Sequence, residues 1–332
     1  MRVQYHDRQT STIDLMRILK KDEIVQVIEG LDPSYLLMQI EKAMVAIALN
    51  QVNMPPVGHL GFDSPPGDVH IKYGHITGDA SYVIKIASGF SQNSALGLSN
   101  SNGMMLAFSA KTGELQAVLL DEGYLTDQRT AIAGAVVAKH MAPGTVEGIG
   151  IIGTGIQARL QLEWLKTVTN CRKAYVHGRS SEKMDAFIRD MSGEFTITAC
   201  QTPAIVAAKA NLIVTTTPSN SPLLMASDIR PGTHITAMGS DTPGKQELDE
   251  NILATSSIVA CDSIEQCLAH GEVCHAVGKG VMSEDQLTTV GAVINDGIQR
   301  NDEDITVADL TGIATQDIKI TLSVIETLDQ SA

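Results

Sequence analysis

The alternation of apolar and polar residues indicates a mixed α and β region in the first part of the chain. A short strand is expected at residues 16–19, a helix over 21–28, and a longer amphipathic helix from Pro33 to Leu49. Three strand-like segments follow, at residues 69–73, 82–86 and 103–108. A hairpin over 108–120 should turn at residues 111–113.

The pattern changes after residue 125 to a rhythm typical of a parallel sheet. An Ala-rich helix is expected over 126–140, with Thr126 as its capping residue. Strand-like segments then alternate with helical ones, at 173–177, 212–216, 234–238 and 257–261. The last segment, 310–328, is predicted to be a helix that returns to the first half of the chain. The predicted α/β fold has a Rossmann-type parallel-sheet nucleotide domain at 129–307 and a discontinuous α+β substrate domain at 1–128 and 308–332.

Composition and charge narrow the class of protein. The 332 residues are 43% hydrophobic, yet no apolar run reaches the roughly 18 residues of a membrane span. Residues 1–8 are polar and lack a signal segment, so a soluble, cytoplasmic protein is expected. A net charge of −14 argues against nucleic acid or anionic membrane as a partner. The five cysteines lack metal-type spacing and are read as free core thiols, so no metal is expected.

The segment 147–158 has the form of a dinucleotide-binding turn, because an apolar run ends in glycines and continues as a helical pattern. Gly153 would permit the tight turn, Gly155 would let the backbone approach a pyrophosphate, and Ala158 would keep helix and strand close. The expected cofactor contacts in this turn are Gly153, Thr154, Gly155, Ile156, Gln157 and Ala158.

The segment after the next strand favours NADP(H) over NAD(H). An acidic side chain at this position selects the ribose hydroxyl of NAD, but here the strand runs into Gly178, Arg179 and Ser180. Arg179 and Ser180 offer donors for a 2′-phosphate. Further cofactor contacts are expected from Thr216, Thr217, Met238, Gly239 and Lys245.

Asp241 follows a predicted strand of the nucleotide domain. Ligands of such folds bind beyond the carboxyl ends of the strands, which would place Asp241 near the nicotinamide. Alternatively, the Asp-Thr-Pro-Gly segment is a turn without chemistry.

Three motifs in register resemble the ornithine cyclodeaminase/mu-crystallin family. They lie at residues 121–131, 153–157 and 239–248, and the resemblance extends from about Leu19 to Leu328. It implies two domains, a homodimer formed through the first domain, and an active site between the domains. Arg129 would then lie near the substrate and the cofactor phosphate, Lys85 would meet the substrate carboxylate, and Asp241 would be the catalytic aspartate. Lys245 and Asn100 also match polar positions of the family's site.

One departure concerns the family's arginine after its proline motif, where this chain has Val57. His59 or Lys72 would have to replace that contact, and ornithine itself becomes a less suitable substrate.

The resulting functional prediction is an oxidoreductase acting on a small imino or amino acid. Arg or Lys can pair with the carboxylate of an α-imino acid, and a carboxylate can stabilise the protonated imine that accepts hydride. The expected reaction is NADPH-dependent reduction of Δ1-pyrroline-2-carboxylate or Δ1-piperideine-2-carboxylate to L-proline or L-pipecolate. The alternatives are an NAD-dependent ornithine cyclodeaminase, another amino-acid dehydrogenase, and a mu-crystallin-like protein that only binds NADPH or a ligand.

Overall fold

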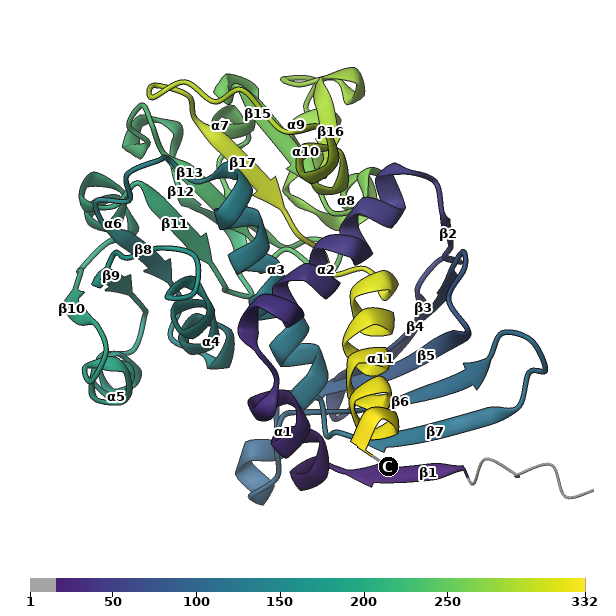
Figure 1. The fold of residues 1–332 in the computed structure, drawn as a ribbon. Coiled ribbons are helices and arrows are strands. Elements are labelled where there is room, and N and C mark those ends of the chain that lie inside the picture. The colour runs from purple at the N-terminus through teal and green to yellow at the C-terminus, as the bar shows by residue number, and fades with distance from the viewer. Residues whose placement is uncertain (1–15, 332) are drawn as a thin grey trace, which may run out of the picture.

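The computed structural model describes residues 16–331, which form two β-sheets linked by long helices (Figure 1). The polar segment at residues 1–8 lies outside the described residues. Within the described part, no helix is both long enough and apolar enough to cross a membrane.

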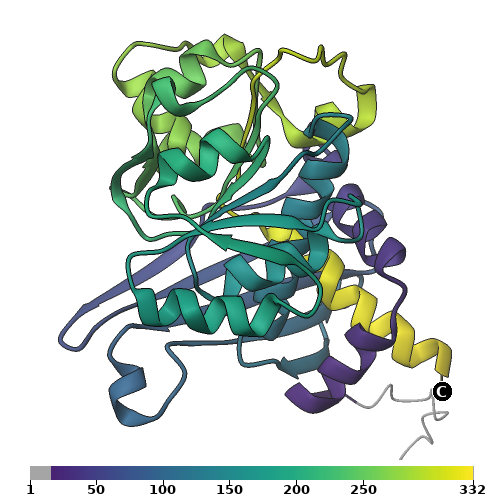
Figure 2. The same ribbon diagram turned by 90° about the vertical axis from the view of Figure 1, so that its left-hand side faces the viewer.

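The first sheet has seven strands in the order β1-β7-β6-β5-β4-β2, with β3 paired to β4. All neighbours are antiparallel except β1 and β7. The strands are β1 (Arg17–Lys20), β2 (Val52–Asn53), β3 (Gly58–Asp63), β4 (Pro66–Ile76), β5 (Ser81–Phe90), β6 (Ser101–Ser109) and β7 (Leu115–Leu120). The predicted strands of this region are confirmed, whereas the β3–β4 hairpin was not predicted. In Figure 2 this hairpin extends to one side of the molecule.

Two helices pack on this sheet, α1 (Lys21–Gly30) and α11 (Ala314–Ser331), and α2 (Pro33–Ala48) packs on α11. The Asp32 carboxylate accepts the Ser34 N–H at 2.8 Å, and Pro33 opens α2, which explains its sharp start. The C-terminal helix α11 contacts β4, β5 and β6. It begins at Ala314 rather than at residue 310, because the chain turns through Gly312 at φ +79°.

The second sheet is fully parallel, in the order β10-β9-β8-β11-β13-β17-β15-β16. The strands are β8 (Ile149–Ile152), β9 (Lys173–His177), β10 (Thr196–Ala199), β11 (Leu212–Thr215), β13 (His234–Ala237), β15 (Ile258–Cys261), β16 (Leu287–Thr289) and β17 (Thr306–Asp309). This is a doubly wound sheet whose order reverses at β8, so the predicted Rossmann-type α/β fold is confirmed.

The remaining elements connect and flank the strands of the two sheets. The helices are α3 (Tyr124–Met141), α4 (Ile156–Leu165), α5 (Ser181–Met191), α6 (Pro203–Lys209), α7 (Glu250–Thr255), α8 (Ile264–His270), α9 (Glu272–Gly278) and α10 (Val290–Asp296). A two-stranded pair, β12 (Asn220–Leu224) and β14 (Gln246–Leu248), and three single 3₁₀ turns, η1 (Asn93–Leu96), η2 (Ala226–Asp228) and η3 (Glu284–Gln286), make up the rest.

Helix α3 joins the two sheets and begins earlier than predicted. Its N-cap is Gly123 in the left-handed region, and Thr126 lies inside the first turn rather than capping it. The Asp121 carboxylate accepts the Leu125 N–H at 2.8 Å and serves the start of the helix instead. The predicted boundary at 128/129 falls within this helix, and the sheet runs slightly past 307, to Asp309. The domain boundaries remain a prediction.

Candidate functional site

The glycine turn lies where the strand order of the parallel sheet reverses. Gly153 follows β8 and its N–H donates to the carbonyl of His177 at 2.9 Å, while the Thr216 N–H donates to the carbonyl of Ile152 at 2.9 Å. Gly153 has φ +122°, and a Cβ there would lie 2.4 Å from Thr216 Oγ1. Only glycine fits this turn, which brings the ends of β8, β9 and β11 together.

The N-terminus of α4 faces open space. Gly155 is the N-cap, and no atom lies within 4 Å of the position where its Cβ would stand. Free backbone N–H groups at such a terminus bind phosphate. Ala158 is fully buried, and Gln157 Nε2 donates to the Asp127 carbonyl at 3.1 Å, so the turn is tied to α3. These residues fit a dinucleotide pyrophosphate.

Two other residues of the turn have different surroundings. The carbonyl of Thr154 accepts from Arg159 Nη1 at 2.6 Å, which braces the loop from behind. The side chain of Ile156 is 56% exposed beside the start of α4.

Arg179 and Ser180 follow β9 beside this turn. Arg179 is exposed and, within residues 16–331, forms no hydrogen bond or ion pair. Ser180 is the N-cap of α5, and its hydroxyl oxygen accepts the Lys183 N–H at 3.2 Å. Arg179 is therefore free to meet a phosphate, whereas Ser180 already has a structural role.

A buried carboxylate that sequence reasoning missed organises the neighbouring strand ends. Glu247 accepts from Thr215 Oγ1 at 2.6 Å, Thr217 N at 2.6 Å, Thr217 Oγ1 at 2.7 Å and Gly239 N at 2.8 Å. It therefore holds the loops after β11 and β13, where Thr216, Thr217, Met238 and Gly239 were expected to contact the cofactor. Glu247 lies in the motif at residues 239–248, but only the folded structure shows that its side chain points inward.

Arg129, Asp241 and Met238 line one cavity of about 50 Å³, together with Thr130, Ala133 and the loop after β17. Asp241 is half-exposed and pairs with Lys245, with Nζ 2.6 Å from Oδ1. The structure thus brings together Asp241, the expected catalytic carboxylate, Arg129 of α3, and Met238, which was expected to contact the cofactor.

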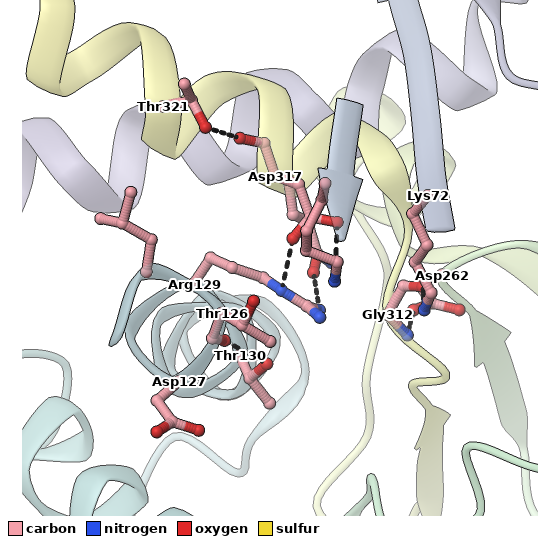
Figure 3. A network of polar contacts seen from close by, with 12 residues as sticks. Lys72, Thr126, Asp127, Arg129, Thr130, Asp262, Gly312, Asp317 and Thr321 are labelled. Carbon is pink, nitrogen blue, oxygen red and sulfur yellow. Dashed lines mark hydrogen bonds and ion pairs between the residues drawn. The ribbon is translucent and has the colours of Figure 1, made fainter. Parts of the chain in front are cut away.

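Behind this cavity lies a buried ion cluster (Figure 3). Asp317 Oδ2 is 3.0 Å from Lys85 Nζ, and its Oδ1 is 3.0 Å from Arg129 Nε. Arg129 Nη1 also donates to Gln316 Oε1 at 2.9 Å. Lys85 comes from β5, Arg129 from α3 and Asp317 from α11, so the cluster connects three distant parts of the chain. No functional role was predicted for Asp317, which is buried in α11 beside Ile318 and Thr321.

Burial determines the titration of this cluster. Burial lowers the pKa of Lys85 to about 7, and the charge of Arg129 adds to that effect while Asp317 opposes it. Burial alone would raise the pKa of Asp317, but the charges of Lys85, Arg129 and Lys72 together hold it below its usual value. Asp317 is therefore a carboxylate, and Lys85 is poised to change charge near neutral pH.

Lys72 adds a third cation to the same strand face. It stands opposite Lys85 in the β4–β5 register, and its Nζ donates to the carbonyl of Thr311 at 3.2 Å and of Gly312 at 2.5 Å. Asp262 holds the same loop, because its Oδ2 accepts the Gly312 N–H at 2.6 Å. Figure 3 shows Lys72, Asp262 and Gly312 beside the ion cluster. The contact links the first sheet to the parallel sheet.

Asn100 and His59 lie apart from the cavity lining. Asn100 is exposed in the loop between β5 and β6, where its Oδ1 accepts the Ser94 N–H at 2.9 Å. His59 is exposed on β3, with its ring centroid 5.0 Å from that of His70. Their roles in substrate binding remain predictions.

Several named proteins are similar to this chain over 71% of its length or more. It is 40% identical to an uncharacterised cyclodeaminase, y4tK, of Sinorhizobium fredii, over 92% of this chain and 93% of that protein. It is 37% identical to an alanine dehydrogenase of Archaeoglobus fulgidus, covering 93% and 94% of the two chains. A Δ1-pyrroline-2-carboxylate reductase of Bacillus cereus is 31% identical, over 71% and 74%.

The fold has the same relatives among solved structures. An archaeal alanine dehydrogenase dimer with bound NAD superposes with a TM-score of 0.87 at 30% identity, covering 96% of this chain and 97% of that one. The Δ1-pyrroline-2-carboxylate reductase of Thermococcus litoralis gives 0.88 at 23% identity, over 96% and 99%, which is a likeness of fold. Relatives of this kind confirm the prediction of an oxidoreductase class that acts on imino and amino acids. The family model for ornithine cyclodeaminase/mu-crystallin matches residues 20–332, and the chain belongs to the ornithine cyclodeaminase/mu-crystallin family.

Proposed function

We propose that this protein reduces the C=N bond of a small α-imino acid with a nicotinamide cofactor, and that its substrate is a cyclic imino acid of the Δ1-pyrroline-2-carboxylate or Δ1-piperideine-2-carboxylate type. The observation that carries the proposal is that Arg129 and Asp241 line one cavity beside Met238 of the cofactor face. A cation for the substrate carboxylate and a carboxylate for the protonated imine thus face the same space.

Arg129 and Lys85 bind the carboxylate of the substrate in this proposal. Both cations are buried and already share Asp317. Asp317 keeps them in place before the substrate arrives, so little reorganisation is needed on binding. Because charge-assisted hydrogen bonds are strong in a buried site, this contact fixes the orientation of the imine carbon.

Asp241 relays a proton from solvent to the imine nitrogen, and the carboxylate then stabilises the positive charge that forms there. Its ion pair with Lys245, across the turn at residues 241–245, orients the carboxylate. A bound NADPH supplies the hydride. Gly155 and the start of α4 hold its pyrophosphate, and Arg179 holds its 2′-phosphate.

The test is a cofactor-oxidation assay with both cyclic imino acids, run with NADPH and with NADH, beside ornithine with NAD. We expect cofactor oxidation with a cyclic imino acid and no ammonia from ornithine. Ammonia release from ornithine, without imine reduction, would overturn the proposal in favour of a cyclodeaminase.

The role of Asp241 is tested by Asp241→Asn. Removing a proton-transfer group costs about 10²–10⁴ in rate, so kcat should fall by that order while NADPH affinity stays within about twofold. Unchanged turnover would remove Asp241 from the mechanism. Binding of NADPH with no turnover of any imino acid by the parent protein would instead support a ligand-binding role.

A small linear α-imino acid is the second candidate substrate. The specific observation in its favour is the size of the cavity, about 50 Å³, which suits a side chain of very few atoms. The same assay with pyruvate and ammonia, which form such an imine, distinguishes the two. A higher kcat/KM for pyruvate plus ammonia than for the cyclic imino acids would favour the amino-acid dehydrogenase.

The preference for NADPH is tested at Arg179. The guanidinium is exposed and unpaired among the described residues, and a cation beside a phosphate contributes about 1.5–3 kcal/mol. Arg179→Gln should therefore weaken NADPH binding by about 10-fold or more and leave NADH unchanged. Arg189→Gln, at the other end of α5, is the matched control. An equal loss of affinity for NADPH and NADH, or a loss of NADPH affinity in the control, would contradict a role of Arg179 in selecting NADPH.

We also propose a homodimer formed through the open face of the first sheet. The face of this sheet opposite α11 is apolar and only half-buried, with Ile84, Ile86, Leu106, Val118 and Ile18. A sheet that is apolar on both faces needs a cover on each, and a second copy supplies it.

A further inference from the structure

Three side chains of the type that ligate metals meet on the β3–β4 hairpin. His59 pairs with His70 in the antiparallel register of the two strands, and their ring centroids are 5.0 Å apart. Asp68 lies two residues before His70 on the same strand face, with Oδ1 3.9 Å from His70 Nδ1. One ligand atom from each of the three residues lies within 4.8 Å of the others.

These groups are not committed to other partners. Within residues 16–331, His59, Asp68 and His70 have no side-chain partner outside this cluster. Most other histidines of the described chain are engaged, with ring nitrogens bonded to carbonyls, hydroxyls or a carboxylate: His75, His140, His177, His234 and His275. The proximity of two imidazoles and a carboxylate that have no other polar partner among the described residues therefore requires its own explanation.

The chemistry and geometry suit a divalent transition cation. Zn²⁺ binds imidazole nitrogen and carboxylate oxygen at about 2.0–2.2 Å, which separates neighbouring ligand atoms by about 3.3–3.6 Å in a tetrahedral site. Bringing the ligand atoms from within 4.8 Å of one another to this spacing therefore requires side-chain movements of about an ångström. The exposed ring of His59 and the partly exposed Asp68 can make that movement.

The cluster adjoins the candidate active site. His70 and Lys72 are two residues apart on β4 and share a strand face with Lys85. An ion held by three protein ligands keeps a fourth position for water or for a carboxylate. A cation here would stand on the same strand face as the proposed substrate-binding lysine.

We propose that His59, Asp68 and His70 form a binding site for a divalent transition cation, with Zn²⁺ as the representative ion. The site is independent of the reductase activity proposed above. A second cluster, Cys261, Cys267 and Asp309, is fully enclosed, and Cys267 Sγ already contacts Asp262 and the Asp309 carbonyl. In the experiment, this second cluster is the alternative site at which the ion could bind.

The test is calorimetric titration of the untagged full-length protein with Zn²⁺, followed by the absorption spectrum of its Co²⁺ form. We expect one ion per chain and a Co²⁺ spectrum of nitrogen and oxygen ligands, without the intense near-ultraviolet band of thiolate ligation. His59→Ala, His70→Ala and Asp68→Asn should each weaken binding by at least about 10-fold. His75→Ala, on the opposite face of β4, is the matched control and should bind as the parent does.

Circular dichroism of each variant separates loss of the site from loss of the fold. Absence of binding in the folded parent would overturn the proposal. Unchanged binding in folded His59→Ala and His70→Ala would do so too, as would a thiolate band in the Co²⁺ spectrum. Because the readout is metal binding, failure of the proposed reductase activity would leave this result unaffected.

Discussion

At the scale of single residues, two buried cations and the half-buried Lys72 gather around one buried carboxylate. Lys85 and Arg129 contact Asp317 directly, and Lys72 acts on it through its charge. Unpaired buried charges are costly, whereas paired ones roughly offset their desolvation. Asp317 therefore determines whether the other charges can remain at this site.

Replacing Asp317 by asparagine should be strongly destabilising. Asn keeps the shape but leaves two buried cations without their counterion, which costs about 3–5 kcal/mol. Urea unfolding measures the free energy. The control is Asp329→Asn, which removes the exposed ion pair with Arg17 and should cost under about 1 kcal/mol. Similar losses in the two variants would contradict a special role for Asp317.

The pKa of Lys85 predicts a specific pH dependence. Lys85 binds a carboxylate only when charged, and its charged fraction falls as the pH rises through about 7. The kcat/KM for the imino acid, which reports the free enzyme, should therefore decrease over that range. Lys85→Arg stays charged and should move this decrease to higher pH. An identical profile in both proteins would assign the titration to another group.

The same lowered pKa has a consequence for stability, with the sign set by proton binding. The unfolded lysine titrates near 10.4, so between about pH 7 and that value the unfolded chain binds more protons than the folded one. The contribution of Lys85 to the free energy of unfolding thus increases as the pH rises through this window.

At the scale of elements, the glycine turn and the start of α4 depend on backbone conformation that side chains would disturb. Gly153 occupies φ +122° against Thr216, and Gly155 faces open space. The first glycine therefore shapes the turn, and the second leaves room for the ligand.

Gly153→Ala should weaken both the fold and nucleotide binding. A strained backbone of this kind costs about 1–3 kcal/mol, and the new Cβ would displace Thr216 from its position 2.4 Å away. Thermal unfolding and fluorescence titration with NADPH measure the two effects. Gly193→Ala, where a Cβ meets no atom within 4 Å, should change stability by less than about 0.5 kcal/mol. Unaltered NADPH affinity in Gly153→Ala would argue against this turn as the phosphate site.

At the scale of the whole molecule, the candidate site exists because two sheets meet. Lys72 reaches from β4 to the loop after β17, and α11 returns to the first sheet. The first sheet keeps one helix-covered face and one open apolar face. That asymmetry is what the proposed homodimer explains.

The dimer predicts a particle of twice the 35.4 kDa chain mass in light-scattering chromatography. Ile18→Asp places a charge on the open sheet face, where Ile18 is 55% exposed, and should produce a folded monomer. Ile205→Asp, on exposed α6 of the nucleotide layer, should leave the mass at that of the dimer. A monomeric parent, or a dimeric Ile18→Asp variant, would refute the proposed interface.

The sequence by itself determined what depends on local periodicity and on short motifs. Strand and helix patterns predicted the parallel sheet, and the Gly153–Gly155 spacing predicted the turn, because these signals arise from backbone geometry within a few residues. Locally ambiguous ends were missed: α3 starts at Tyr124 after a left-handed Gly123, and α11 starts only after Gly312.

Only the tertiary structure decided which distant side chains meet. Asp317 lies 188 positions from Arg129 along the chain, and Glu247 reaches Thr215 and Gly239 from the short strand β14, whose orientation no local pattern specifies. His59 and His70 became neighbours through a strand register that was not predicted. Such contacts depend on the packing of whole elements, so the charges that neutralise one another and the groups left free are properties of the folded chain.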